Sequence, residues 1–308
     1  MLNITQAYKS ISDSLYLPQE TKSLMEQAWK IRTANFPMEI SAVTPVKTGS
    51  VSVTGTGCAL NCAHCGKHYL KGMITLDAVL SGEGRSKYTS YLISGGCTTQ
   101  GKVPLLPHLE QLRQLKKSAR LNLHTGLIDR EEACSLTEVA DAVSFDFVCS
   151  REILQKVYGL DKNVSDYLES YRALVECFGT QKVIPHITIG LDRGQVTHEV
   201  KAVELLASEG ISRLVILVLI PTPGTSFQRM PAPNLVETAA AIARIRALIP
   251  TTPIFLGCMR PGGAYRRQLD LLALRCGINK IVQPAPNIFT AARELGLEVK
   301  TEKECCAL

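Results

Sequence analysis

The chain has 308 residues, of which 45% are hydrophobic and 20% charged, with a formal net charge of +6 and eleven cysteines. The basic excess is mild, spread out and free of interleaved aromatics, which argues against a nucleic-acid-binding surface. The longest aliphatic run, Leu214 to Ile220, is much shorter than the roughly 20 residues of a membrane helix. No signal peptide is apparent, so we expect a cytoplasmic protein that binds neither membranes nor nucleic acids.

The predicted elements begin with a helical extension over residues 1–47, in which a helix is expected near 13–33. From residue 50 onward, short β-branched runs alternate with amphipathic runs, a pattern typical of parallel α/β folds. The strands are predicted at 51–56, 91–94, 120–124, 142–147, 183–190, 213–220, 253–257 and 280–283. The helices between them are predicted at 104–117, 130–140, 164–178, 196–209, 233–248, 266–275 and 287–295.

Eight strands alternating with helices predict an α/β fold, a (β/α)8 barrel of the TIM type. A doubly wound open sheet is the alternative architecture. A TIM-type barrel of about 250 residues would occupy residues 48–295 and leave a short, cysteine-containing tail over 296–308. Active sites of such barrels gather at the carboxyl ends of the strands, so the residues that follow each predicted strand are the candidate site.

Three cysteines follow the first predicted strand. Cys58, Cys62 and Cys65 lie in the run Gly-Thr-Gly-Cys-Ala-Leu-Asn-Cys-Ala-His-Cys-Gly. Structural zinc sites and most iron–sulfur clusters take four ligands, so three thiolates from one loop predict a four-iron cluster with one iron open. A zinc site or a redox loop is the alternative. The high, odd number of cysteines favours metal chemistry over a disulfide framework in a reducing compartment.

The Cys-x3-Cys-x2-Cys spacing resembles the signature of the radical S-adenosylmethionine enzymes, and the whole predicted barrel resembles their biotin synthase-like branch. The resemblance implies a [4Fe-4S] cluster on the three cysteines, with S-adenosyl-L-methionine bound at the open iron. Electron transfer to this cofactor would yield methionine and a 5′-deoxyadenosyl radical, which removes hydrogen from an unactivated carbon. An electron donor such as ferredoxin or flavodoxin is implied as a partner.

The same resemblance implies cofactor contacts at other strand ends. Ser94, Gly95 and Gly96 would bind the amino group of the methionine, since paired glycines allow close backbone approach, although a simple turn is the alternative. Asp146 would accept hydrogen bonds from the ribose, or else serve as a cap or salt-bridge partner. His64 occupies a position where the family usually has an aromatic residue, and it would pack over the adenine.

Two more residues near predicted strand ends carry weaker hypotheses. His186 lies on the fifth predicted strand, either as an ordinary barrel residue or as a proton donor. Arg260 follows the seventh predicted strand and would anchor a second cluster or a substrate carboxyl group. Both hypotheses depend on whether the side chains point into the barrel.

The other cysteines predict a second cluster. Cys97 follows Gly96, Cys258 ends the seventh predicted strand, and Cys305 and Cys306 are adjacent in a tail that looks exposed. The tail could fold over the barrel mouth, so that its two thiolates bind an auxiliary [4Fe-4S] cluster together with one or both of Cys97 and Cys258. Alternatively, Cys97 and Cys258 are small buried residues. The remaining cysteines are expected to be structural: Cys134, Cys149, Cys177 and Cys276.

Short motifs resemble the two-subunit lipoyl synthases of archaea and some bacteria, although residues 1–57 lack the additional cysteine triad of ordinary lipoyl synthase. The resemblance implies a sulfurtransferase acting on an octanoylated lipoyl carrier protein, with a paralogous radical SAM subunit as partner. A radical methylase, mutase or metallocofactor maturase is the alternative, and a metal-binding scaffold without turnover is a third. The motifs are Ile93-Ser-Gly-Gly-Cys97, Val143-Ser-Phe-Asp-Phe147, Gly257-Cys-Met-Arg-Pro-Gly-Gly263 and the Cys305-Cys306 tail.

Overall fold

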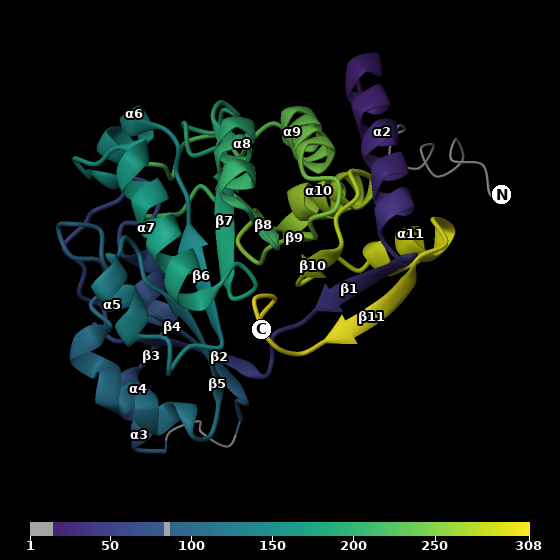
Figure 1. Cartoon of the computed structure of the whole chain (residues 1–308). Helices are drawn as coiled ribbons and strands as arrows, with labels where there is room; N and C mark the ends of the chain where they lie inside the picture. The colour runs from purple at the N-terminus through teal and green to yellow at the C-terminus, as the bar shows by residue number, and fades with distance from the viewer. Residues whose placement is uncertain (1–14, 83–86) are drawn as a thin grey trace.

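The centre of the computed structural model, which describes residues 15–82 and 87–308, is one eleven-stranded sheet. Every ladder between neighbouring strands is parallel, and the order is β11-β1-β10-β9-β8-β7-β6-β5-β4-β2-β3. Figure 1 shows the sheet curling around the C-terminus of the chain. The strands are β1 (Glu39–Val43), β2 (Thr48–Ser52), β3 (Ile74–Thr75), β4 (Ser90–Ser94), β5 (Arg120–His124), β6 (Ala142–Asp146), β7 (Val183–Ile189), β8 (Leu214–Val218), β9 (Ile254–Leu256), β10 (Lys280–Val282) and β11 (Glu298–Glu302).

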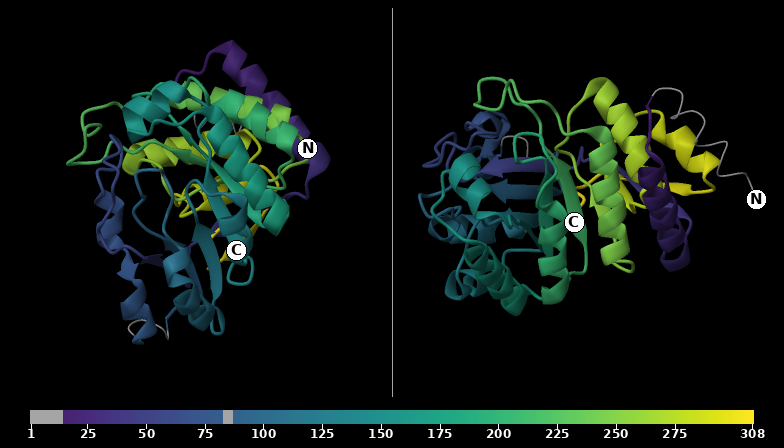
Figure 2. Two further views of the ribbon diagram at one scale, coloured as in Figure 1. Left: turned by 60° about the vertical axis from the view of Figure 1, so that its left-hand side comes forward. Right: turned by 90° about the horizontal axis from the view of Figure 1, so that it is seen from above.

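The helices cover the outer face of the curled sheet, as the two views of Figure 2 show. Among residues 15–82 and 87–308, no helix combines the length and the apolar character that a bilayer crossing requires. The α-helices are α2 (Gln19–Asn35), α3 (Leu76–Leu80), α4 (Leu109–Lys116), α5 (Arg130–Ser135), α6 (Arg151–Ile153), α7 (Val164–Phe178), α8 (Glu199–Glu209), α9 (Leu235–Leu248), α10 (Gly263–Arg275) and α11 (Ile288–Glu294). Three short helical turns complete the set: η1 (His68–Gly72), η2 (Leu106–His108) and η3 (Leu154–Tyr158).

The eight predicted strands are all present, as β2 and β4–β10, within four residues of their expected bounds. The sheet nevertheless differs from a closed eight-stranded barrel. It has three further strands, and its end strands β3 and β11 share no ladder in the described part of the chain. The expected N-terminal helix is α2; the part of that prediction before residue 15 lies outside the described residues. Within the expected extension, β1 joins the sheet between β10 and β11.

The outward face of the central strands is apolar and packs against the helices, whereas their inward face also carries buried polar residues, among them Asn122, Ser144 and His186. In β7, every residue except Thr188 is buried, and the outward Ile187 and Ile189 belong to the main core with the helices. A second, smaller core lies inside the curl, where Cys306 and Ala307 of the tail contact inward side chains. These inward side chains are Val43, Ala142, Ile184, Val215, Phe255 and Val282.

The C-terminal tail closes the amino end of the curled sheet, opposite to the expected mouth. The amide of Cys305 donates to Oγ1 of Thr48, the first residue of β2, at 2.7 Å. Glu304 forms an ion pair with Arg120, the first residue of β5. Cys306 is 7% exposed, so the expectation of an exposed tail was wrong. Apolar burial of Cys306 and Ala307 against the strands explains this path.

Candidate iron–sulfur site

The loop after β2, residues 53–67, carries the Cys-x3-Cys-x2-Cys motif, and we call it the cysteine loop. Backbone hydrogen bonds fix it to two neighbouring loops at the carboxyl ends of the strands. The amide of Ala59 donates to the carbonyl oxygen of Cys97 at 2.8 Å, and the amide of Phe227 donates to that of Ala63 at 3.1 Å. The loop is therefore held at the end of the sheet where parallel α/β proteins place their active sites.

The three motif cysteines lie together, and Cys97 joins them. Burial and, to a smaller extent, the charges of Cys65, Cys97 and Cys58 raise the pKa of Cys62 to about 12. The amide of Cys97 donates to Sγ of Cys58 at 3.2 Å. All four thiols are part-exposed and none is in a disulfide. Bound metal would displace the thiol protons, because the thiolate is the ligand.

The three motif thiols do not converge on one point, as the ligands of a single metal ion would. Within the two described ranges, no three His, Cys, Asp or Glu side chains converge as the ligands of a single ion do. In a four-iron cluster each thiolate binds a different iron, so its ligands need not converge on one point. The donor set of three neighbouring thiols thus fits the predicted four-iron cluster.

Gly96 is required by the close approach of the cysteine loop. A side-chain carbon on Gly96 would overlap the carbonyl oxygen of Gly57 and would lie 2.6 Å from Cα of Cys58. The amide of Gly96 also donates to Oγ1 of Thr54 at 2.7 Å. The paired glycines were predicted to bind the methionine amino group. That role stays a prediction, and the structure gives Gly96 a second one, positioning Cys58.

Ser94 and Gly95 lie beside the start of the same loop. The carbonyl oxygen of Ser94 accepts from the amide of Val53 at 2.9 Å. A side-chain carbon on Gly95 would lie 3.1 Å from the side chain of Val53. The sequence-predicted cofactor residues at the end of β4 are therefore in contact with the cysteine loop.

Gly96→Ala is expected to displace Cys58 and to lower the iron bound per chain after anaerobic reconstitution by more than half. The backbone atoms that meet the added methyl group cannot move away cheaply, because they belong to the loop that holds the thiols. Gly72→Ala is the matched control, since no atom of the described residues lies within 4 Å of the added carbon there. Equal iron content in the two variants would contradict this role of Gly96.

Asp146, at the end of β6, faces two buried histidines. Burial lowers the pKa of His64 and of His186 to about 4, and the Asp146 carboxylate partly opposes both shifts. The ring of His64 packs edge-on against Tyr158 at 5.0 Å between centroids, and its Nδ1 is buried without a partner among the described residues. A buried nitrogen of this kind needs a hydrogen-bond partner, which an adenosyl group could provide.

His124 is a site candidate that sequence reasoning missed. Its ring lies 5.5 Å from that of His186, edge-on, at the end of β5. Nδ1 of His186 donates to the carbonyl oxygen of Ile184 at 3.0 Å, so Nε2 is the free nitrogen of the neutral ring. The available signal was the place of His124 as the last residue of a predicted strand.

Cys258, Cys305 and Cys306 form a second group of thiols, of which Cys258 is exposed and Cys306 is buried. The S–H of Cys306 lowers the pKa of Cys305 to about 6, and the hydrogen bond to Cys305 raises that of Cys306. Burial raises the pKa of Cys258, and the nearby Cys305 raises it further. Nδ2 of Asn122 lies 3.8 Å from Sγ of Cys305. Of the two cysteines expected to join the tail, only Cys258 does so.

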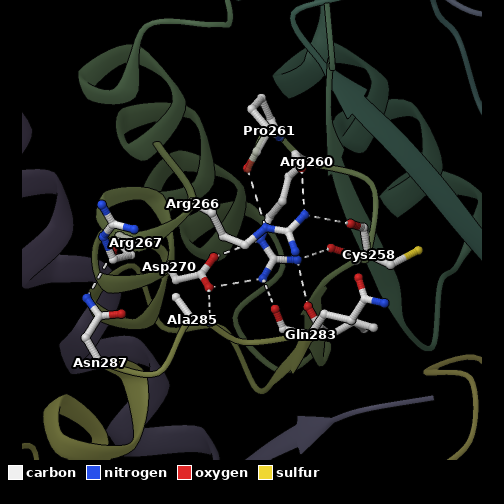
Figure 3. A network of polar contacts seen from close by, with 11 residues as sticks. Cys258, Arg260, Pro261, Arg266, Arg267, Asp270, Gln283, Ala285 and Asn287 are labelled. Atoms are coloured by element: carbon white, nitrogen blue, oxygen red, sulfur yellow. Dashed lines mark hydrogen bonds and ion pairs between the residues drawn. The ribbon is translucent and has the colours of Figure 1, made fainter. Parts of the chain in front are cut away.

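Arg260 is a buried structural residue (Figure 3). Its Nε and Nη2 donate to the carboxylate of Asp270 at 2.8 and 3.0 Å. Its Nη1 donates to the carbonyl oxygens of Gly257 at 2.6 Å and Val282 at 2.7 Å. Because each guanidinium nitrogen already has a protein partner, the hypothesis of a cluster or substrate anchor was wrong. Through Gly257, Arg260 instead holds the loop of Cys258.

Arg260→Met is expected to lower the free energy of unfolding by about 3–5 kcal/mol, because it leaves the Asp270 carboxylate buried and unpaired. The double variant Arg260→Met with Asp270→Leu should recover part of this loss. Urea unfolding checks both values. Arg244→Met is the control, since its ion pair with Glu20 is exposed and is worth about 0–1 kcal/mol. Similar losses at both arginines would contradict the structural role of Arg260.

The cysteines expected to be structural lie away from both groups. Cys134 and Cys177 form a disulfide between α5 and α7. Cys276 is buried, and Sγ of Cys149 lies 3.1 Å from the carbonyl oxygen of His198. The cysteine count was expected to favour metal chemistry over a disulfide framework, and this disulfide gives Cys134 and Cys177 a structural role.

No family model matches the chain, and no curated protein matches it. Among solved structures, the [FeFe]-hydrogenase maturase HydG from Carboxydothermus hydrogenoformans is similar, with a TM-score of 0.70 and 15% identity over 97% of this chain and 76% of that one. Methylornithine synthase (PylB) has a TM-score of 0.65 and 13% identity over 97% and 94% of the two chains. The protein therefore shares the curled parallel α/β fold of a maturase and a synthase.

Proposed function

We propose that this protein is a radical S-adenosylmethionine enzyme that inserts sulfur at an unactivated carbon of a protein-bound octanoyl chain. The observation that carries the proposal is the cysteine loop, with three motif thiols gathered at the carboxyl end of a curled parallel sheet. The shared fold with HydG and PylB supports an enzyme of this architecture.

Cys58, Cys62 and Cys65 would hold a [4Fe-4S] cluster. Bound together with S-adenosylmethionine and reduced, that cluster supplies the 5′-deoxyadenosyl radical that removes a hydrogen atom from the substrate. Asp146 would accept hydrogen bonds from the ribose, and Nδ1 of His64 would bond the adenosyl group. The low pKa of His64 keeps its ring neutral, so it orients the cofactor without adding charge.

The second thiol group supports sulfur insertion. Cys258, Cys305 and Cys306 would hold an auxiliary [4Fe-4S] cluster, whose chemistry is to supply sulfur to the substrate carbon. Arg260 would position Cys258 through the Gly257 carbonyl. Cys97, which contacts Cys58, would stay with the cysteine loop.

A radical methylase, mutase or metallocofactor maturase without sulfur insertion remains the alternative, and the fold fits it about equally. HydG, for example, is a maturase. The second thiol group favours sulfur insertion, because reactions that need only one cluster have no use for three further thiols. The proposed partners are an octanoylated lipoyl carrier protein, a paralogous radical SAM subunit and an electron donor of the ferredoxin or flavodoxin class.

Mass spectrometry of an octanoylated carrier peptide tests the reaction. The peptide is incubated anaerobically with reconstituted protein, S-adenosylmethionine and dithionite, with or without the paralogous subunit. We expect the peptide to gain one sulfur atom and the Cys62→Ala protein to leave it unchanged. An unchanged peptide in the presence of the paralogous subunit, with 5′-deoxyadenosine still formed, would overturn sulfur insertion and leave the alternative.

A further inference from the structure

Loops at the carboxyl ends of four strands form one continuous surface. The loop after β8, residues 219–234, lies between the others. Oγ1 of Thr222 and the hydroxyl of Tyr69, next to the cysteine loop, share a hydrogen bond of 2.7 Å. On the other side, the hydroxyl of Tyr265 in α10 donates to the carbonyl oxygen of Pro233 at 2.7 Å. The region around the first cysteine group thus continues into the start of α10.

The loop after β7 belongs to the same surface. A side-chain carbon on Gly194 would lie 2.6 Å from the carbonyl oxygen of Pro231, so these two loops pack without a gap. The start of α10 extends the surface to the second thiol group, because Nη2 of Arg266 donates to the carbonyl oxygen of Arg260 at 2.8 Å (Figure 3). The surface therefore adjoins both groups of cysteines.

This surface is strongly basic. Its four segments, residues 58–73, 190–198, 219–234 and 257–267, contain one carboxylate, Asp192, and the exposed Glu152 of the neighbouring α6 lies near Arg193. We name six of their side chains the basic rim; within the described ranges, none of them forms an ion pair. The basic rim consists of Lys67, Lys71, Arg193, Arg229, Arg266 and Arg267.

Two apolar inward side chains lie near the rim. Leu92 of β4 and Leu217 of β8 are part-exposed, whereas the inward residues next to the tail are buried. An aliphatic arm that enters from the rim would therefore meet apolar side chains. A small anion could contact only a few of these side chains, because they are spread over four loops. A partner the size of a protein domain could contact all of them.

We infer that the basic rim docks an acidic protein domain that carries the substrate arm, an inference that rests on the proposed function. The negative surface of the domain would contact the rim while its acyl arm enters between Leu92 and Leu217. Complementary charge mainly raises the rate of association and orients the partner. The interaction should accordingly weaken as salt screens it.

The test reverses charge on exposed rim residues that contact neither thiol group: Lys71→Glu, Arg229→Glu and Arg267→Glu in one rim variant. Product formation on an octanoylated acidic carrier domain is measured with the paralogous subunit and with dithionite as reductant, which removes any protein electron donor from the assay. We expect kcat/KM for the carrier to fall roughly tenfold or more at low salt, through KM, and its salt dependence to shrink.

The control variant makes the same charge change at the amino ends of the strands, with Lys47→Glu, Lys117→Glu and Lys182→Glu, all exposed. It should match the wild type, and all three proteins should form 5′-deoxyadenosine equally without carrier. Equal kcat/KM in the rim variant and the control, or loss of 5′-deoxyadenosine in the rim variant, would overturn the docking role. If the wild type makes no product, the proposed function fails, and the docking role is then tested by measuring how tightly the carrier domain binds. Equal affinity of the wild type and the rim variant for the carrier domain would overturn the docking role.

Discussion

Cys62→Ala is expected to abolish 5′-deoxyadenosine formation and to remove about four irons per reconstituted chain. Cys62 is one of three thiols of a cluster that keeps one iron free of protein, so its loss leaves only two motif ligands. The neighbouring Cys97 already donates its backbone amide to Cys58 and stands outside the motif spacing. Iron analysis and chromatographic measurement of 5′-deoxyadenosine check the result.

Cys149→Ala is the matched control for this prediction. Cys149 is also a part-buried free thiol, but its Sγ contacts the carbonyl oxygen of His198 and no other cysteine raises its pKa. We expect this variant to keep its iron and its activity. Full iron and full 5′-deoxyadenosine in Cys62→Ala would show that the cluster is held elsewhere.

Cys305→Ala is expected to reduce iron from about eight to about four per chain, because it removes one ligand of the auxiliary cluster only. Cys305 lies beside Thr48 at the amino end of β2, away from the cysteine loop, so 5′-deoxyadenosine should still form while sulfur incorporation stops. Cys258→Ala should behave in the same way, since Cys258 lies beside Cys305. Iron analysis and mass spectrometry of the carrier peptide measure the two effects separately.

Cys276→Ala is the control for the second group, because Cys276 is fully buried among helices and contacts the carbonyl oxygen of Ala239. Its loss should leave both the iron content and the product unchanged. A wild-type protein with about four irons per chain would contradict the auxiliary cluster. Loss of 5′-deoxyadenosine in Cys305→Ala would contradict the separation of the two groups.

The central strands were predictable because short, mostly apolar and β-branched runs alternate with amphipathic helical runs along the chain. Strands at the edge lack that signal. β11 has the sequence Glu-Val-Lys-Thr-Glu, with no fully buried residue, and it pairs only with β1. Its pairing depends on the path of the chain rather than on local composition. The same holds for β1, which follows α2 and was therefore included in a helical extension.

The first cysteine group was predictable because its ligands come from one short loop with a specific spacing. The partners of the second group depend on tertiary structure. Cys97 and Cys258 both follow predicted strands, and only the packing of Gly96 against Cys58 assigns Cys97 to the first group. Likewise, the tail lies at the amino ends of the strands because Cys306 is buried in the smaller core. The residues around Cys306 in the sequence do not indicate that it is buried.

The formation of 5′-deoxyadenosine from S-adenosylmethionine, by the anaerobically reconstituted and dithionite-reduced protein, tests the central claim most directly. The account predicts that 5′-deoxyadenosine forms, that its formation requires Cys58, Cys62 and Cys65, and that it does not require Cys258, Cys305 or Cys306. A protein that binds iron on the cysteine loop yet forms no 5′-deoxyadenosine would contradict the assignment of this loop to radical chemistry.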